Sequence, residues 1–419
     1  MRTLAEWLEL HESVHAKSID LGLGRVGEVA RRLALQSVAY PVVTVGGTNG
    51  KGSTVAHLAA LLRALGIRAG AFTSPHLLNY NERIRIDGAA VQDAELVAAF
   101  ERIEAARGHT TLTFFEYNTL AALQIFAQRK VDAAVLEVGL GGRLDATNII
   151  DADVAVVCSI GFDHRDWLGD DLDSIGREKA GIFRRGRPAV LGSPDMPATV
   201  FAQIEARGAR AVVAERDFSW TIDGATWSYK SHGRRFNELP RSALAGSIQY
   251  RNAATAIAAL QELKVAEHLD ENVIGTALRT VRLPGRFQIV PGSVEWILDV
   301  AHNEPAALVL ARHLAERPHR GRTIAVVGIL RDKDAAGIGR ALAGQIDHWI
   351  LCALAGLRGQ SAHELGLQLG TAIAAQAEEA NSIAGGCERA RKLALEGDRV
   401  LVFGSFPAVG LALQWLRLY

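Results

Sequence analysis

The chain has 419 residues, 49% of them hydrophobic, and its 46 Lys and Arg residues balance its 46 Asp and Glu residues. The zero net charge argues against a nucleic-acid or polyanion binder, which usually carries a basic excess. Single cores stop growing at roughly 250 to 300 residues, so the length predicts two cores. The N-terminus has no apolar signal core, no apolar run approaches the ~18 residues of a membrane span, and the three cysteines form no C-x-x-C pair, so we expect a cytoplasmic protein.

The first glycine motif along the chain is GLGRVG at 22–27, which matches the dinucleotide pattern G-x-G-x-x-G. That pattern requires a preceding strand and an acidic residue ~20 positions later for the ribose. The preceding segment HESVHAKSID does not have the composition of a strand, and after Glu28 the next acidic residue is Glu82. We therefore do not expect a dinucleotide site here.

Short apolar runs then alternate with amphipathic segments, which predicts a mostly parallel sheet covered by helices. Residues 218–239 alternate differently and predict a small antiparallel sheet. The expected strands are 41–45, 67–72, 132–138, 153–160 and 187–192, and the expected helices are 53–65, 92–107, 116–129, 172–183, 249–263 and 268–280.

Pro284 and Gly285 interrupt this pattern, and a second α/β alternation follows them. We therefore predict two domains, 1–284 and 285–419, the second of ordinary single-domain size. Its expected strands are 294–300, 322–330, 348–354 and 399–405.

The stretch GGTNGKGST at 46–54 joins a predicted strand to a predicted helix. It departs from the phosphate-loop pattern G-x-x-x-x-G-K-[ST], because Val45 replaces a glycine and Gly52 replaces a hydroxyl residue. A glycine turn before a helix still gathers backbone N–H groups and the positive end of the helix dipole, which suits phosphate. We predict a phosphate site in which Lys51 reaches the outer phosphates and Ser53 supplies a hydroxyl; the alternative is a tight turn with a solvated lysine.

Candidate metal ligands follow the other predicted strands of this sheet. Glu137 ends one strand and Ser74 follows another, at the edge where open α/β sheets bind ligands, although Glu137 alone is also compatible with an exposed glutamate. His164 follows a third strand among four aspartates, a better setting for a ligand than that of a lone histidine. Oxygen ligands near a phosphate site predict Mg²⁺. Lys179 lies nearby in sequence, but its spacing alone predicts a surface lysine.

The second domain has a comparable strand end in ILDVAHN at 297–303, where Asp299 ends the strand and His302 lies in the turn. Arg286 stands at the junction of the two predicted domains. From that position alone, we expect an arginine able to close on phosphates when the domains close.

Together these motifs resemble the folylpolyglutamate synthase/dihydrofolate synthase family of the Mur-ligase superfamily, especially its bifunctional bacterial members. The family's loop is the variant G-T-N-G-K-G-[ST], with which Val45 and Gly52 agree. The resemblance implies a P-loop Mur-ligase-like α/β domain with a mostly parallel sheet, followed by a smaller Rossmann-like α/β domain. The matching motifs run in family order over residues 19 to 303: GGTNGKGST, TSPHL, LTFFEYNTLAAL, LEVGLGGRLDATN, DHRDWLG, GREKAGIF, LPGRFQIV and DVAHN.

The resemblance implies site residues for ATP, for two Mg²⁺ ions and for a pterin. The residues implied for ATP are Thr48, Asn49, Gly50, Lys51, Gly52, Ser53, Asn252, Arg286 and Asp299. The residues implied for the metals are Ser74, Glu137, His164 and Lys179. The residues implied for the pterin are Asp20, Thr113, Phe115, Glu116, Gly142, Arg143, Asp145 and Ala146. Catalytic roles are implied for Lys51, Lys179 and His302. Of these, His302 matches a family histidine near the γ-phosphate.

Three of these residues have a specific chemistry in the family. Lys179 matches a lysine that is carbamylated, because a bare ammonium beside two Mg²⁺ would be repelled whereas its CO₂ adduct is an anionic ligand. Phe115 would stack on the pterin ring. Asp145 would hydrogen-bond the amino-pyrimidinone edge of that ring.

The implied activity is ATP-dependent amide formation, in which ATP phosphorylates a carboxylate and the amine of L-glutamate attacks the acyl phosphate. The acceptor would be dihydropteroate, or tetrahydrofolate and its polyglutamates, and the intact run LGGRLDATN predicts both activities. We expect a monomer that binds neither nucleic acid nor membranes. Two alternatives stay open: a UDP-muramoyl peptide ligase, which should carry an extra UDP-binding domain before the loop, and a non-catalytic nucleotide switch, which would not need Glu137, His164 and Lys179.

Overall fold

The computed structural model describes residues 2–17, 19–231, 233–263, 265 and 267–419, and the chain folds into two compact units. Unit 1 comprises Met1–Ala243 and Tyr250–Val281, and unit 2 comprises Leu244–Gln249 and Arg282–Tyr419. The segment Leu244–Gln249 groups with unit 2 because Ile248 N donates a 3.4 Å hydrogen bond to His313 Nε2 there. The predicted boundary after residue 284 would place this segment in the first domain.

A mostly parallel sheet of eight strands organises unit 1. The apolar runs form its parallel strands, whereas the β3–β4 hairpin is antiparallel and was not predicted. The spatial order is β4 (Ala89–Ala90), β3 (Ile84–Ile86), β2 (Ala69–Phe72), β5 (Ala133–Glu137), β1 (Val42–Gly46), β6 (Val154–Val157), β7 (Pro188–Leu191) and β8 (Arg210–Val213).

Register aligns the carboxyl ends of the middle strands. Val45 of β1 pairs with Glu137 of β5, and Gly46 pairs with Val157 of β6. Phe72, the last residue of β2, pairs with Leu136 of β5. The loops that follow β1, β2, β5 and β6 therefore leave the sheet at one edge, which is where parallel α/β sheets bind ligands.

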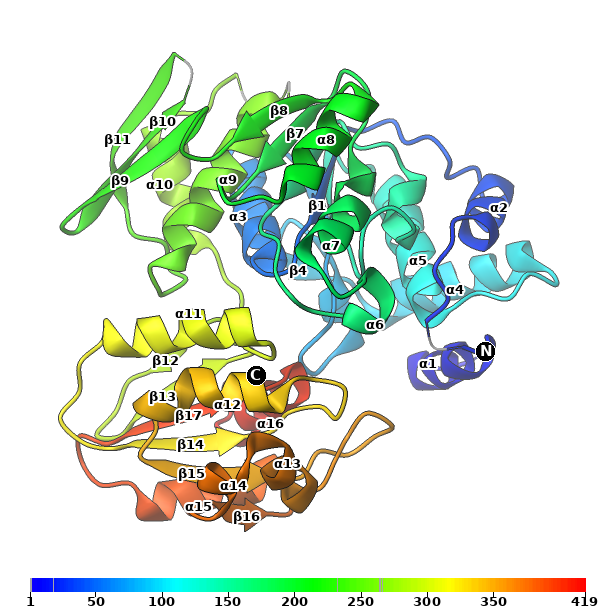
Figure 1. Cartoon of the computed structure of the whole chain (residues 1–419). Coiled ribbons are helices and arrows are strands. Elements are labelled where there is room, and N and C mark those ends of the chain that lie inside the picture. The colour runs from blue at the N-terminus through cyan, green and yellow to red at the C-terminus, as the bar shows by residue number, and fades with distance from the viewer. Residues whose placement is uncertain (1, 18, 232, 264, 266) are drawn as a thin grey trace. The chain divides into compact units, whose positions relative to one another are not determined.

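Helices cover this sheet, and the small antiparallel sheet and helix α2 lie at opposite ends of unit 1 (Figure 1). The antiparallel sheet predicted within 218–239 is confirmed as β9 (Phe218–Asp223), β10 (Thr226–Ser231) and β11 (Arg234–Pro240). The helices are α1 (Leu4–Ser13), α2 (Gly24–Arg32), α3 (Lys51–Ala64), α4 (Asp93–Arg107), α5 (Phe114–Arg129), α6 (Arg165–Leu168), α7 (Leu172–Lys179), α8 (Ala198–Arg207), α9 (Ile248–Glu262) and α10 (Glu271–Thr280), with 3₁₀ turns η1 (Tyr80–Arg83), η2 (Ala146–Ile149) and η3 (Ala180–Ile182).

Unit 2 contains a six-stranded sheet in which only the edge pair β12–β13 is antiparallel. The order is β12 (Gln288–Val290), β13 (Glu295–Asp299), β17 (Arg399–Phe403), β14 (Thr323–Val327), β15 (His348–Cys352) and β16 (Glu378–Ala380). Its helices are α11 (Glu304–Ala315), α12 (Ala335–Leu342), α13 (Ala362–Leu369), α14 (Thr371–Ala374), α15 (Ile383–Leu393) and α16 (Phe406–Trp415), with the 3₁₀ turn η4 (Ala343–Gln345).

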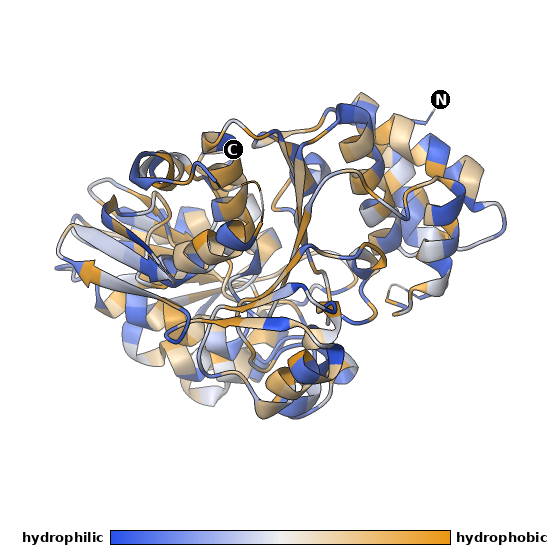
Figure 2. Ribbon diagram, turned by 90° about the horizontal axis from the view of Figure 1, so that it is seen from above, coloured by the Kyte–Doolittle hydropathy of each residue, from blue (hydrophilic) through white to orange (hydrophobic). Residues whose placement is uncertain are grey.

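Buried apolar residues lie on the central strands of both large sheets and on the helices. The hydropathy colouring of Figure 2 shows helices on which hydrophobic and hydrophilic residues alternate. Each unit has its own clusters of buried apolar side chains, and the predicted mostly parallel α/β fold with a second α/β unit is confirmed. Within the described residues, no helix is both long and apolar enough to span a membrane.

Candidate active site

The loop between β1 and α3 depends on two glycines. Gly47 has φ +132° and Gly50 has φ +90°, values that residues with a Cβ rarely adopt. A Cβ on Gly47 would lie 3.0 Å from the backbone nitrogen of Cys158, and one on Gly50 would lie 2.9 Å from Asn252 Oδ1. Both positions therefore require glycine for conformation and for space, and the predicted ATP residue Asn252 packs directly on the loop.

Hydrogen bonds fasten the loop to the segment after β6. Thr48 N donates to Ser159 O at 2.7 Å, and Thr48 Oγ1 lies 3.0 Å from both the N–H and the carbonyl oxygen of Gly161. Asn49 N donates to Ser159 Oγ at 3.2 Å, and this hydroxyl donates back to Asn49 O at 3.0 Å. Two predicted ATP residues are thus held in place by Ser159, which was not predicted.

Helix α3 begins at Lys51 with Gly50 at its N-cap and no side chain capping it. Thr54 N donates to Gly50 O at 2.9 Å, so the preceding N–H groups, those of Lys51, Gly52 and Ser53, have no carbonyl partner within the helix. Such N–H groups at the positive end of a helix form an anion site, which supports the predicted phosphate loop.

Two lysines donate to one carbonyl group of this loop. Lys51 Nζ donates to Gly47 O at 3.1 Å and to Thr48 O at 3.0 Å, and Lys179 Nζ also donates to Gly47 O at 3.1 Å. Burial, and then the charge of Lys51, lower the pKa of Lys179 to about 7. The expectation from spacing alone, a surface lysine, is wrong: Lys179 is 5% exposed and lies against the phosphate loop.

Two predicted metal ligands meet at the carboxyl edge of the sheet. Glu137 is buried at the end of β5, and its Oε2 accepts a 3.2 Å hydrogen bond from Ser74 N, just beyond β2. His164 lies beyond β6 in a left-handed conformation with φ 52°. Its backbone N–H donates a 2.9 Å hydrogen bond to Asp163 Oδ1. Carboxylate and hydroxyl oxygens with an imidazole fit a divalent cation.

The site does not resemble an all-protein metal cage. Among the described residues, no three His, Cys, Asp or Glu side chains are grouped so as to hold a metal ion. The predicted set instead mixes Ser74 and Lys179 with Glu137 and His164, so it would need ligand oxygens from the nucleotide or from a modified lysine.

The loop after β5 carries four predicted pterin residues and contacts a fifth, Phe115. A Cβ on Gly139 would lie 2.5 Å from Phe115 Cζ, so the Phe115 ring lies directly on this loop. Arg143 N donates to Glu178 O at 2.9 Å, and a Cβ on Gly142 would lie 2.8 Å from Lys179 O. The loop therefore packs against the end of α7 that carries Lys179.

Asp145 shapes this loop from within. Its Oδ2 accepts from Gly139 N at 3.0 Å and from Leu140 N at 2.9 Å, while its Oδ1 accepts from Thr147 N at 3.0 Å and from Thr147 Oγ1 at 2.6 Å. Burial raises the pKa of Asp145 above its usual value. Four donors fill the carboxylate, so the hydrogen bond expected to a pterin stays a prediction that requires one of them to be replaced. Ala146 follows it and opens η2.

Asp20 and Glu116 are brought together by Arg25, a residue that sequence reasoning missed. Arg25 Nη1 donates to Asp20 Oδ2 at 2.7 Å, and Arg25 Nη2 lies 3.2 Å from Glu116 Oε1. Glu116 also forms a capping box with Thr113 at the start of α5. Arg25 lies inside the rejected motif GLGRVG, which the structure places mainly on helix α2; the described residues from 14 to 23 contain no strand. The one sequence feature that could have indicated Arg25 was its positive charge, which complements the negative charges of the predicted pterin residues Asp20 and Glu116.

The predicted residues of unit 2 gather at the carboxyl end of β13. Asp299 is partly buried and accepts from Phe287 N at 2.7 Å and from Ala301 N at 2.8 Å, and its partial removal from water raises its pKa. The guanidinium of Arg286 lies 5.0 Å from the Phe406 ring centre, and the His302 ring lies 5.9 Å from the same ring. Arg286, His302 and Phe406 therefore form one cluster; assigning Arg286 and Asp299 to the nucleotide stays a prediction.

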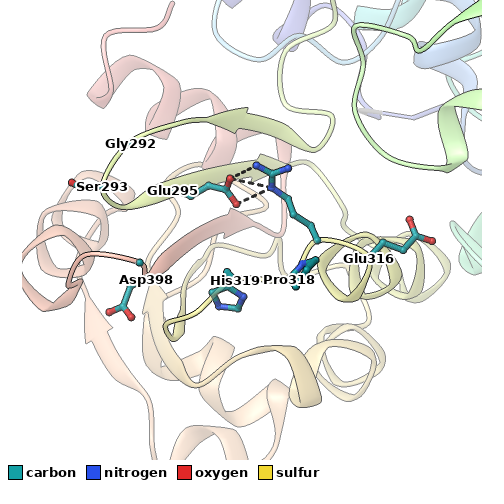
Figure 3. A pocket seen from close by; sticks show the side chains of 9 residues that line it. Gly292, Ser293, Glu295, Glu316, Pro318, His319 and Asp398 are labelled. Atoms are coloured by element: carbon teal, nitrogen blue, oxygen red, sulfur yellow. Dashed lines mark hydrogen bonds and ion pairs between the residues drawn. The ribbon is translucent and has the colours of Figure 1, made fainter. Parts of the chain in front are cut away.

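A pocket of about 400 Å³ lies at the opposite end of the unit 2 sheet, where β13 and β17 begin (Figure 3). Two of its charged lining residues form an ion pair with each other, because Arg317 Nε lies 3.0 Å from both carboxylate oxygens of Glu295. No predicted site residue lines it. The lining residues are Gly292, Ser293, Glu295, Glu316, Arg317, Pro318, His319, Gly397 and Asp398.

Comparison with known families assigns both units. Residues 45–260 match the Mur ligase middle domain, and residues 285–406 match the Mur ligase glutamate ligase domain. A dihydrofolate synthase/folylpolyglutamate synthase of Escherichia coli is 44% identical over 98% of this chain and 95% of its own length. The protein of that name from Haemophilus influenzae is 42% identical over 97% and 96%.

Solved structures agree with these relatives. Escherichia coli FolC in complex with DHPP and ADP matches with a TM-score of 0.94 and 43% identity, covering 99% of this chain and 98% of its own. A bifunctional folylpolyglutamate synthase/dihydrofolate synthase with Mn, AMPPNP and L-glutamate bound matches with a TM-score of 0.92 and 43% identity, covering 100% and 99%.

Proposed function

Because this chain belongs to the Mur ligases, within the dihydrofolate synthase/folylpolyglutamate synthase family, we propose that it binds ATP, metal and pterin through the residues gathered in unit 1. It is an ATP-dependent ligase that adds L-glutamate to dihydropteroate and to reduced folates. We further propose that one pterin site serves both additions, since Phe115 on α5 packs on the loop after β5, which carries Gly142, Arg143, Asp145 and Ala146.

One observation carries this assignment. Gly47 O accepts hydrogen bonds from both Lys51 and Lys179, so the phosphate loop and the end of α7 meet at one point. Lys179 O in turn packs on Gly142 of the predicted pterin loop. The groups proposed to hold the transferred phosphoryl group and the pterin are therefore neighbours within unit 1.

The reaction transfers a phosphoryl group and then an acyl group. A carboxylate oxygen of the folate substrate attacks the γ-phosphorus, and the bond from that phosphorus to ADP breaks. The glutamate amine then attacks the acyl carbon, phosphate leaves with the bonding electrons, and the amine loses its proton. The N–H groups at the start of α3 and the Lys51 ammonium would bind the phosphate oxygens and stabilise their charge.

A divalent ion would neutralise the charge on the phosphates when bound. The manganese in the related structure and the donor chemistry of this chain support such an ion at Ser74 and Glu137. A second ion near His164 is a further proposal. Buried Glu137 would orient its ion through the carboxylate that Ser74 N already holds.

We propose that Lys179 acts as its carbamate. Its amine is buried, its pKa is lowered to about 7, and it lies beside a second cation, Lys51. A neutral amine is the form that adds CO₂, and the resulting anion would remove the repulsion between an ammonium and bound metal.

Two activities on one chain can be tested with a single assay. ADP release by the purified protein is measured with ATP, Mg²⁺ and L-glutamate, with either dihydropteroate or tetrahydrofolate as acceptor. We expect glutamate-dependent release with each acceptor. Release with tetrahydrofolate but never with dihydropteroate would contradict the proposal of two activities. A protein that releases ADP without either acceptor would instead behave as a nucleotide hydrolase.

The remaining expectations concern the state of the protein. We propose that the protein is cytoplasmic, because a reducing compartment is compatible with its three buried free cysteines, Cys158, Cys352 and Cys387. We also propose that it is a monomer. Light scattering of the purified protein at micromolar concentration would show a mass near 45.0 kDa, and a mass near twice that value would contradict the monomer.

A further inference from the structure

Arg25 joins two segments that are far apart in the sequence. It lies on α2 and donates twice to Asp20, through Nη1 to Oδ2 at 2.7 Å and through Nη2 to the backbone oxygen at 2.6 Å. Its Nε also donates to Glu116 Oε2 at 3.4 Å, across 91 positions of sequence. One guanidinium thus holds both the backbone of the early loop and the first turn of α5.

These contacts differ from an ordinary surface ion pair. The Arg25 side chain is 26% exposed and Glu116 only 4%, whereas Arg31 and Glu28 on the same helix α2 are 59% and 37% exposed. Exposed pairs contribute little because water screens them. A forked guanidinium that bridges two less exposed carboxylates imposes a geometry on both.

One oxygen of Glu116 is left without a hydrogen bond. Thr113 N donates to Glu116 Oε2 at 2.7 Å, which orients the carboxylate at the start of α5. The other oxygen, Oε1, is buried and has no hydrogen-bond donor among the described residues, although Arg25 Nη2 lies 3.2 Å away. A buried acceptor without a donor is costly unless a ligand supplies one.

We propose that Arg25 is a positioning residue for the pterin end of the substrate. It holds Asp20 and Glu116 so that Glu116 Oε1 can accept from the amino-pyrimidinone edge, which presents N–H donors. Arg25 acts through the two carboxylates and does not touch the reacting atoms. This inference rests on the proposed function, which places the pterin against Asp20 and Glu116.

The test is Arg25→Ala in the full-length chain, with Arg31→Ala as the matched control on the same helix. We expect the KM for dihydropteroate and for tetrahydrofolate to rise about tenfold, the effect of one misplaced charge-assisted hydrogen bond. The KM for ATP and kcat should stay within about twofold, because the phosphate loop is unaffected. Arg31→Ala should change none of these values. If Arg25→Ala does not fold, Arg25→Gln carries the same test.

A double-mutant cycle shows whether Arg25 acts through the carboxylates. In a Glu116→Gln background, Arg25→Ala should raise the pterin KM by clearly less than it does alone. An unchanged or lower pterin KM in Arg25→Ala would overturn the inference, as would an equal rise in the KM for ATP.

The single variants Asp20→Asn and Glu116→Gln separate this inference from the proposed function. If they raise the pterin KM and Arg25→Ala does not, the role of Arg25 is refuted while the pterin site stands. If none of the three variants changes the pterin KM, the pterin lies elsewhere and both proposals fail.

Discussion

Lys179 combines burial, a lowered pKa and proximity to the phosphate loop. Among the described residues, its Nζ donates only to Gly47 O, so no carboxylate hydrogen-bonds to the ammonium. With a pKa of about 7, roughly half of the amine is neutral at neutral pH, and the neutral share grows as the pH rises. Burial makes this environment costly for an ammonium, and the neighbouring charge of Lys51 favours an anionic CO₂ adduct over a second cation.

We therefore expect Lys179→Ala to lose at least about 99% of the ligase activity, the hundredfold loss typical of removing a group that supports the transferred charge. Added bicarbonate should not restore it, whereas a short carboxylic acid such as acetate should restore part, because it can replace the carboxylate of the adduct. Carbon-13 NMR with labelled bicarbonate should show a carbamate in the unmodified chain and none in the variant.

The exposed Lys392→Ala variant provides the control, since Lys392 forms only a surface pair with Glu388 on α15. Its activity and its carbamate signal should equal those of the unmodified chain. Full activity in Lys179→Ala would refute the role of the carbamate.

At the scale of elements, the strand–loop–helix unit β1–α3 depends on Gly50. An alanine there would adopt φ +90°, at a cost of about 1 kcal/mol or more, and its Cβ would lie 2.9 Å from Asn252 Oδ1. The loop must move to relieve this contact. We expect Gly50→Ala to raise the KM for ATP at least about tenfold, because the N–H groups at the start of α3 then miss the phosphates.

Gly66→Ala at the other end of α3 is the matched control. Gly66 has φ +76°, so the substitution has a similar conformational cost, but no atom lies within 4 Å of the added Cβ. Thermal unfolding should show a comparable loss of stability in both variants, while the KM for ATP should rise in Gly50→Ala alone. Equal KM values in the two variants would mean that the loop tolerates the contact.

Elements that bury an apolar run could be predicted from the sequence, and elements that depend on distant contacts could not. The predicted strand 132–138 corresponds to β5 (Ala133–Glu137) because its residues are buried and apolar. Helix α2 was not predicted, since its mean composition is polar and only Val26, Val29 and Ala30 are buried. The positions of Glu137 and Ser74 at the carboxyl edge of the sheet could be predicted, because each residue lies at or just beyond the end of a predicted strand.

Contacts across the sequence account for the site residues that were missed. Ser159 fastens Asn49 across 110 positions, and Arg25 reaches Glu116 across 91. No local pattern encodes either contact, because each depends on how the strands and helices pack. The burial of Lys179 was missed for the same reason: its helix has polar periodicity, but its end packs beneath the phosphate loop.

At the scale of the whole molecule, most of the predicted site residues belong to one of the two units. The predicted phosphate loop, the candidate metal ligands and the predicted pterin loop all belong to unit 1, whereas Arg286, Asp299 and His302 belong to unit 2. Each unit buries its own apolar clusters, so unfolding of the chain is not expected to be one two-state transition. Calorimetry that resolves the unfolding transitions of the two units can therefore show which unit a ligand stabilises.

Metal and nucleotide should stabilise unit 1 in two separable steps. A ligand at 100 times its Kd adds about 2.7 kcal/mol to the stability of the form that binds it. We expect ADP to raise the unfolding temperature of unit 1, Mg²⁺ with ADP to raise it further, and EDTA to remove only the second increment. Glu137→Gln should lose the Mg²⁺ increment and keep the ADP increment, because Glu137 is a proposed metal ligand and the loop is intact.

The exposed Glu101→Gln on α4 is the control for that comparison, because it removes the same charge away from the sheet edge. It should keep both increments. An Mg²⁺ increment in Glu137→Gln equal to that of the unmodified chain would place the metal on other ligands. Glu137 would then serve at the carboxyl end of β5 through protein contacts such as the hydrogen bond from Ser74 N. The metal would have to bind through the nucleotide and other ligands.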